Sequence, residues 1–95
     1  LIATDRIFCD LGGDRPGNPD GMKVDVQGNV YCGGSGGIWV IAPSGKHLGT
    51  LVHGKDGTTN IAWGDSGSST LYFTTRHTLG SVDLKIKGIP VPAKR

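Results

Sequence analysis

The sequence predicts an all-β fold, and two observations carry this prediction. The 95 residues include 17 glycines and many β-branched residues, and little in the chain favours a helix. This composition is typical of short strands joined by tight turns. One plan of strands also occurs twice, because Tyr31 and Tyr72 are 41 positions apart, and Val40 and Val82 are 42 apart. β-Propeller blades have four strands and a period of about 40–50 residues. We therefore expect a β-propeller fragment of about two blades.

Each expected strand is an apolar run bounded by turn residues. A first strand near residues 2–10 would belong to a preceding blade. Residues 20–53 would form one blade, with strands at Met22–Val26, Asn29–Gly33, Ile38–Ala42 and His47–Val52. Residues 58–87 would form the next blade, with strands at Thr59–Gly64, Thr70–Thr75 and Ser81–Ile86. We expect two antiparallel sheets packed face to face, followed by a C-terminal tail at residues 88–95.

The connections between these strands have hairpin chemistry. Gln27-Gly28-Asn29, Pro43-Ser44-Gly45-Lys46 and Asp65-Ser66-Gly67-Ser68 each contain residues that supply or preset the φ values of tight turns. Two blades cannot close a ring, and propeller blades bury their flat faces only against neighbours. We therefore expect the chain to be a fragment whose remaining blades lie elsewhere.

Composition and charge argue against several classes of partner. The net charge is +2, and the basic residues are scattered apart from a few near the C-terminus, so we expect no nucleic-acid partner. No apolar run approaches the ~20 residues of a membrane span, so we expect no membrane partner. No signal peptide is visible, and both a cytoplasmic and a periplasmic location stay open.

The two cysteines and a serine-containing motif have simple structural interpretations. Cys9 and Cys32 lack the spacing of a zinc site, and we expect buried thiols, although a disulfide between them stays possible. Gly64-Asp65-Ser66-Gly67 copies the sequence around a trypsin-like nucleophile. The chain is too short for that fold, so Ser66 is expected in a hairpin turn.

Other residues that could carry chemistry also have structural explanations. The glycine-rich run at residues 33–37 lacks the lysine and the following helix of a phosphate-binding loop. The histidines are isolated in sequence and are expected to be surface or core residues, and the tryptophans are expected to pack within the blades. These residues are His47, His53, His77, Trp39 and Trp63.

One aspartate is a candidate for a functional site. Asp20 lies in the segment Pro16–Met22, which leads into the first strand of a blade, the strand that lines the central channel of a propeller. We expect Asp20 at the channel mouth, between a restricted proline and a permissive glycine. It could be a turn residue or an oxygen ligand for a hard divalent cation. Asn18 could offer another oxygen, but turn formation explains it equally well.

The run Arg15–Tyr31, which contains Pro-Asp-Gly-Met, resembles gluconolactonases of the senescence marker protein, gluconolactonase and luciferin-regenerating enzyme family. The resemblance covers nearly the whole chain, including Thr58–Gly64, Thr70–Thr75 and the ending Gly88–Pro92. It implies a six-bladed propeller with one divalent metal ion in its central channel. Members hydrolyse sugar lactones, and some relatives cleave organophosphates.

The resemblance also assigns a role to Asp20. The family holds its metal with a glutamate, two asparagines and an aspartate in a Pro-Asp-Gly context. Only that aspartate has a counterpart in this chain, and Asn60 matches neither asparagine. The resemblance thus implies that Asp20 is both a metal ligand and a catalytic proton acceptor, whereas Asp25 and Asp65 are expected away from the channel mouth. Calcium is expected, with magnesium, manganese or zinc as substitutes.

The implied reaction fits the chemistry of lactones. Ring opening needs an electrophile that polarises the carbonyl and a base that activates water, and a cation and a carboxylate supply these. We expect metal-dependent hydrolysis of a sugar lactone by the full-length protein, with the fragment alone inactive. A non-catalytic propeller module that binds partners through its loops is an alternative. A related metal-dependent esterase or phosphotriesterase is another.

Overall fold

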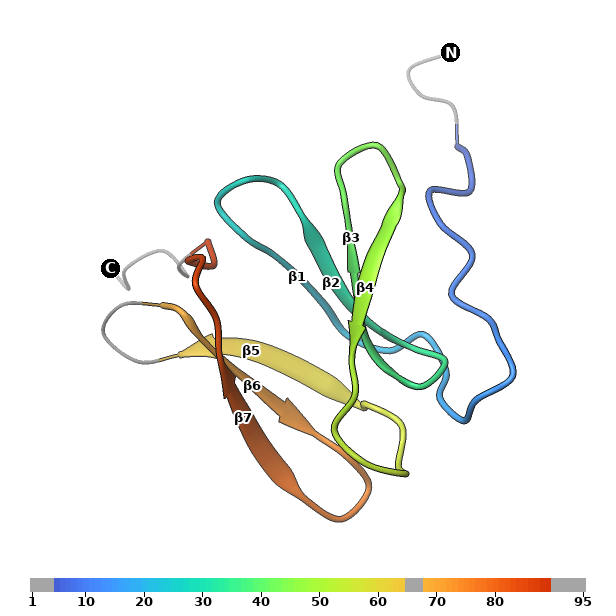
Figure 1. The fold of residues 1–95 in the computed structure, drawn as a ribbon, viewed down its shortest axis with the longest axis vertical. Helices are drawn as coiled ribbons and strands as arrows, with labels where there is room; N and C mark the ends of the chain where they lie inside the picture. The colour runs from blue at the N-terminus through green and yellow to red at the C-terminus, as the bar shows by residue number, and fades with distance from the viewer. Residues whose placement is uncertain (1–4, 65–67, 90–95) are drawn as a thin grey trace.

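The computed structural model describes residues 5–64 and 68–89, which form two antiparallel sheets without a helix (Figure 1). The first sheet has the strand order β1 (Met22–Val24), β2 (Val30–Gly34), β3 (Gly37–Ile41) and β4 (His47–Leu51). The second has the order β5 (Asn60–Gly64), β6 (Thr70–Thr74) and β7 (Leu79–Asp83). The all-β prediction is confirmed. In the part of the chain described, no helix is long and apolar enough to cross a membrane.

Successive side chains of a strand point to opposite faces of its sheet, so each sheet has one face that packs against the other sheet. In the first sheet Tyr31 pairs with Val40, and Ile38 pairs with Leu51. In the second sheet the corresponding face contains Ile61, Trp63, Leu71, Phe73 and Val82. The centre of the shared core is formed by four side chains that are 0–4% exposed: Tyr31, Ile38, Ile61 and Leu71. The predicted face-to-face packing is therefore confirmed.

Trp63 joins the two sheets where β1 lies beside β5. Its indole Nε1 donates a hydrogen bond of 3.1 Å to the backbone oxygen of Val24. Its ring meets the ring of Tyr31 edge to face, with centroids 5.2 Å apart. Gly88 lies against the same indole, and a methyl group at position 88 would come within 2.0 Å of it. Trp63 therefore packs in the core, as predicted, and requires a residue without a side chain beside it.

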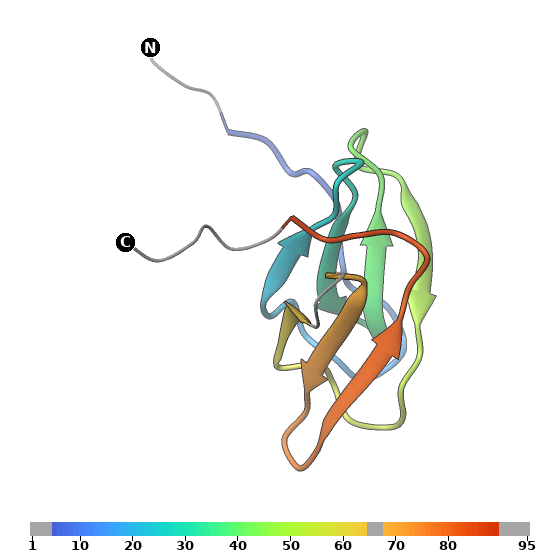
Figure 2. The ribbon, with the colours of Figure 1, turned by 90° about the vertical axis from the view of Figure 1, so that its left-hand side faces the viewer.

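The chain returns from β7 to the first sheet instead of ending in a free tail at residue 88. The backbone nitrogen of Val26 donates to the oxygen of Lys87 at 2.9 Å, and that of Ile89 donates to the oxygen of Val24 at 3.1 Å. Gly88 is buried and forms an isolated bridge with Asp25. Figure 2 shows this segment crossing from the end of β7 toward β1. The expected tail is thus wrong for residues 88–89, because free backbone groups at the end of β1 pair with them.

Two other expectations about strands are corrected. Residues 5–10 form no strand, and residues 1–4 of the expected segment lie outside the described part. A strand exists only within a hydrogen-bonded ladder, and residues 5–10 have no neighbouring strand to pair with. β7 spans Leu79–Asp83 rather than 81–86, because the tight turn after β6 lets pairing begin at once, with Thr74 opposite Leu79.

The outer face of the first sheet lies against the N-terminal segment. Between them is a cavity of about 520 Å³ with a mainly apolar lining that includes Cys9, Met22 and Cys32. Both thiols are free and only half-buried, so the expectation of fully buried cysteines is not met. Trp39 also belongs to this outer face, opposite Cys32, and its ring stacks on His47 with centroids 3.6 Å apart.

Candidate functional site

The loops that could form a site gather at one end of the two sheets. The segment before β1, the turn from β2 to β3, the loop from β4 to β5 and the turn from β6 to β7 all lie at the lower end of Figure 1. The hairpin turns after β1 and β3 lie at the opposite end. This arrangement follows from the antiparallel order, in which alternate connections share an end.

A hollow of about 190 Å³ opens among these loops. Three of the connections supply its walls: the segment before β1, the loop from β4 to β5, and the turn from β6 to β7. Its lining residues are Gly17, Asn18, Asp20, Gly57, Thr58, Thr59 and Arg76. The structure therefore places Asp20 and Asn18, the two candidates from the sequence, in one hollow.

Asp20 is held by its backbone and exposes its side chain. Its carbonyl oxygen accepts a hydrogen bond of 3.3 Å from the nitrogen of Gly33, which fixes the end of the loop against β2. The next residue, Gly21, has a φ of 60°, and a methyl group there would lie 2.6 Å from Oδ1 of Asn60. The glycine thus lets the loop approach the start of β5 closely, which sets the position of Asp20.

The two threonines of the hollow are already engaged within the protein. Thr58 is buried, and its Oγ1 lies 2.6 Å from Nε2 of His53, whose ring stacks on Phe73. Oγ1 of Thr59 lies 2.8 Å from Oγ1 of Thr74, and the backbone nitrogen of Thr59 donates to the oxygen of Thr74. These residues therefore form a fixed wall rather than free ligand-binding groups.

The polar groups left open in the hollow are the side chains of Asn18, Asp20 and Arg76. Within residues 5–64 and 68–89, none of the three side chains makes a hydrogen bond or ion pair. The hollow thus presents a carboxylate, an amide and a guanidinium to whatever enters it. No group of three or more His, Cys, Asp or Glu residues capable of holding a metal occurs in that part of the chain. Asp20 is thus a single anionic ligand at most.

The carboxylate of Asp25, unlike that of Asp20, is fully engaged in contacts within the protein. It is fully buried, and its carboxylate accepts hydrogen bonds of 2.9–3.0 Å from the backbone nitrogens of Gln27 and Asn29, the Asn29 amide and the Tyr31 hydroxyl. Burial raises the pKa of this carboxyl, but the hydrogen bonds from Asn29, Tyr31 and Gln27 outweigh it and hold the pKa below its ordinary value. Asp25 closes the turn after β1, at the end opposite the hollow.

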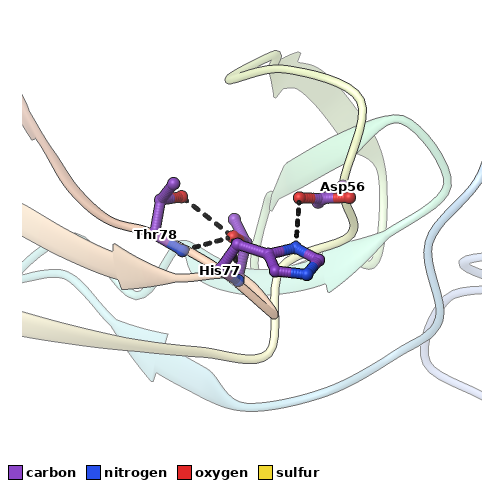
Figure 3. Close-up of polar contacts among 4 residues, drawn as sticks. Asp56, His77 and Thr78 are labelled. Carbon is purple, nitrogen blue, oxygen red and sulfur yellow. Dashed lines mark hydrogen bonds and ion pairs between the residues drawn. The ribbon is translucent and has the colours of Figure 1, made fainter.

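The other residues considered from the sequence are two residues expected in a turn, Asp65 and Ser66, and the three histidines. Asp65 and Ser66 lie outside the described residues. His53 is half-buried beside Phe73, whereas His47 and His77 are exposed. His77 is nevertheless not isolated in space, because its Nδ1 lies 3.3 Å from Oδ2 of Asp56 (Figure 3). Sequence reasoning missed this pair because its members are 21 positions apart.

Sequence reasoning also missed Arg76 as a member of the site. It occupies a short polar segment between two strands, a context that is usual for any solvated turn residue. Only the folding of the β6–β7 turn beside the segment before β1 brings it to the hollow that Asp20 lines. No local signal in the sequence indicates that proximity.

Comparisons with known proteins agree on one family. The family described as the SMP-30/Gluconolactonase/LRE-like region matches residues 1–77. The chain is 39% identical over 74 residues to the gluconolactonase of Zymomonas mobilis subsp. mobilis, an alignment that covers 76% of this chain. A crystal structure of a proposed gluconolactonase superimposes with a TM-score of 0.73 at 27% sequence identity, over 85% of this chain.

The chain is short beside these relatives. It spans 20% of the length of the Zymomonas protein and 28% of the solved chain. The family match at residues 1–77 includes the segment that carries Asp20 and every residue that lines the hollow.

Proposed function

The chain belongs to the SMP-30/gluconolactonase/LRE-like family, and from this premise we propose that the complete protein containing it is a metal-dependent sugar lactonase. The observation that carries the proposal is the position of Asp20. Its carboxylate is exposed, has no partner among the described residues, and lines a hollow built from three separate connections. A turn aspartate with a purely structural role would resemble Asp25, whose carboxylate is saturated with hydrogen bonds.

The proposal includes the architecture around the hollow. The two sheets would be two blades of a six-bladed propeller, with β1 and β5 nearest its axis and the hollow at the mouth of the central channel. The outward faces of the sheets support this, because they carry apolar side chains such as Met22 and Leu79, which are 55% and 72% exposed. Neighbouring blades would cover these faces.

The donor atoms of the hollow fit a hard divalent cation, but only in part. Asp20 offers a carboxylate and Asn18 an amide, and such oxygens are the ligands that calcium prefers, with magnesium, manganese or zinc as substitutes. One carboxylate does not make a site, so we infer that the remaining ligands come from outside these residues. The cation, when bound, would polarise the lactone carbonyl and acidify a water molecule.

The residues of this chain would then act around the ring-opening step. Asp20 would help to hold the cation and accept the proton that the attacking water loses. The walls formed by Thr58 and Thr59 would orient the substrate by shape, since their hydroxyls are already paired. No feature of the described residues favours a non-catalytic module or an esterase over a lactonase.

Metal removal tests the proposal. The complete protein should hydrolyse glucono-δ-lactone in a pH-stat assay, lose that activity after dialysis against a chelator, and regain it when calcium is added. The same treatment should leave the circular dichroism spectrum unchanged. A protein that hydrolyses the lactone equally well after its metal content has been brought to zero would refute the metal-dependent mechanism.

A further inference from the structure

Arg76 stands at the tip of a firmly closed turn. The backbone nitrogen of Thr75 donates to the oxygen of Thr78 at 2.9 Å. Oγ1 of Thr75 in turn accepts hydrogen bonds from the backbone nitrogens of His77 and Thr78 at 3.1 and 3.0 Å. These contacts fix the backbone on both sides of the arginine, so its side chain leaves the turn from a defined position.

A second contact links this turn to the rim of the hollow. His77 Nδ1 and Asp56 Oδ2, 3.3 Å apart, join the β6–β7 turn to the loop from β4 to β5 (Figure 3). The next residue after Asp56 is Gly57, and the residue before His77 is Arg76, and both line the hollow. The pair therefore links two walls of the hollow at its exposed rim. It also occupies Asp56, the acidic residue of the loop from β4 to β5.

The charge of Arg76 is left for a ligand. Asp20 lines the same hollow, yet no ion pair joins it to Arg76 among the residues that the structure describes. A carboxylate and a guanidinium that share a hollow without touching can both bind one molecule between them. A guanidinium favours carboxylate and phosphate groups because its fork of N–H donors matches two oxygens at once.

We infer that Arg76 forms an anion subsite for the carboxylate of the ring-opened sugar acid, an inference that rests on the proposed lactonase function. In the hydrolysis, the oxygen of water bonds to the carbonyl carbon, the ring C–O bond breaks, and a proton passes to the ring oxygen. The acid so formed releases its proton to solvent. A neutral lactone thus becomes an anion, and Arg76 is the cation among the described residues that lines the hollow in which we place that anion.

The test measures binding of gluconate to the complete protein by titration calorimetry, with sorbitol as a neutral molecule of the same carbon number. Arg76→Gln should weaken gluconate binding by about 10- to 100-fold, the usual effect of removing a charge-assisted hydrogen bond. Arg76→Lys should recover part of the loss. Lys55→Gln is the matched control, since it removes an exposed positive charge from the loop from β4 to β5 without altering the hollow, and it should change binding by less than about twofold.

The outcomes separate this inference from the proposed function. Equal gluconate affinities in Arg76→Gln and the unmodified protein would overturn the subsite, as would equal losses in Arg76→Gln and Lys55→Gln. Sorbitol binding as tight as gluconate binding would also overturn it. If the unmodified protein binds gluconate through Arg76 but does not hydrolyse the lactone, the lactonase proposal fails and the subsite stands.

Discussion

The hydroxyl of Tyr31 donates a hydrogen bond of 2.9 Å to the carboxylate of Asp25, and both residues are buried. Burial and the neighbouring carboxylate both raise the pKa of the tyrosine, so it keeps the proton that this contact needs. The pair ties the turn after β1 to the core between the sheets, because the ring of Tyr31 packs against Trp63. A buried charged group is tolerated only when its hydrogen bonds are satisfied, and Asp25 accepts four.

Tyr31→Phe should therefore lower the free energy of unfolding by about 1–3 kcal/mol, since it removes one donor from a buried carboxylate. The measurement is urea denaturation of the complete protein, followed by tryptophan fluorescence. Tyr72→Phe is the control, because Tyr72 is 39% exposed and its hydroxyl makes no hydrogen bond within the described residues. Equal losses in the two variants would show that the Asp25 contact contributes nothing.

Acid should destabilise the protein through the same carboxylate. The pKa of Asp25 is lower in the folded state than the unfolded value of about 3.9. Its contribution is therefore complete above about pH 4 and is lost as the pH falls through the folded pKa. We expect a fall in the free energy of unfolding below about pH 4 that is shallower in Asp25→Asn. Parallel pH profiles for the two proteins would contradict this prediction.

Gly88 and Gly49 offer a matched test of how the chain returns to the first sheet. Gly88→Ala should lower the free energy of unfolding by about 1–3 kcal/mol, because the added methyl group would overlap the indole of Trp63. Gly49→Ala adds a methyl group where no atom lies within 4 Å, so stability should be nearly unchanged. Thermal unfolding of both variants decides the point, and equal melting temperatures would place the C-terminal segment elsewhere.

Much of the fold could be predicted from the sequence because glycine, asparagine and proline mark most of its turns. Gln27-Gly28-Asn29 and Pro43–Lys46 bound apolar runs, so the strands on either side were located within one or two residues. The β7 strand was misplaced because no proline or glycine marks the turn before it. The burial of Asp25 was also missed, since a turn aspartate has the same local sequence whether it is solvated or enclosed.

The candidate site was predictable only in part. The Pro-Asp-Gly segment indicates Asp20 as a candidate. The other residues that line the hollow come partly from loops far along the chain, between β4 and β5 and between β6 and β7. Arg76 and the Asp56–His77 pair depend on how two loops meet, and that is set by the packing of one sheet on the other. Contacts of this kind leave no periodic pattern in the sequence.

The 95-residue chain expressed alone should associate. Both sheets have outward faces with exposed apolar side chains, including Met22, Tyr72 and Leu79, and large exposed apolar patches drive association. The strands at the edges of the sheets also offer unpaired backbone groups. Sedimentation velocity should show aggregates or oligomers. A monomer that unfolds cooperatively on heating would argue against the need for neighbouring blades.

Under the proposed function, the carboxylate of Asp20 takes part in lactone hydrolysis. Asp20→Asn in the complete protein retains a neutral oxygen and removes both the negative charge and the proton acceptor. Asp14→Asn is the control, since Asp14 is an exposed aspartate in the chain before β1 that does not line the hollow. Asp25 cannot serve as the control, because its replacement disturbs a buried network.

The deciding measurement is the rate of glucono-δ-lactone hydrolysis at saturating calcium, with bound metal and circular dichroism recorded for each variant. Asp20→Asn should lower turnover by about 10²–10⁴-fold, the usual effect of losing a catalytic base, with an unchanged fold and reduced metal content. Asp14→Asn should keep nearly full activity. Near-normal turnover in Asp20→Asn, or an equal loss in Asp14→Asn, would show that another group performs the chemistry.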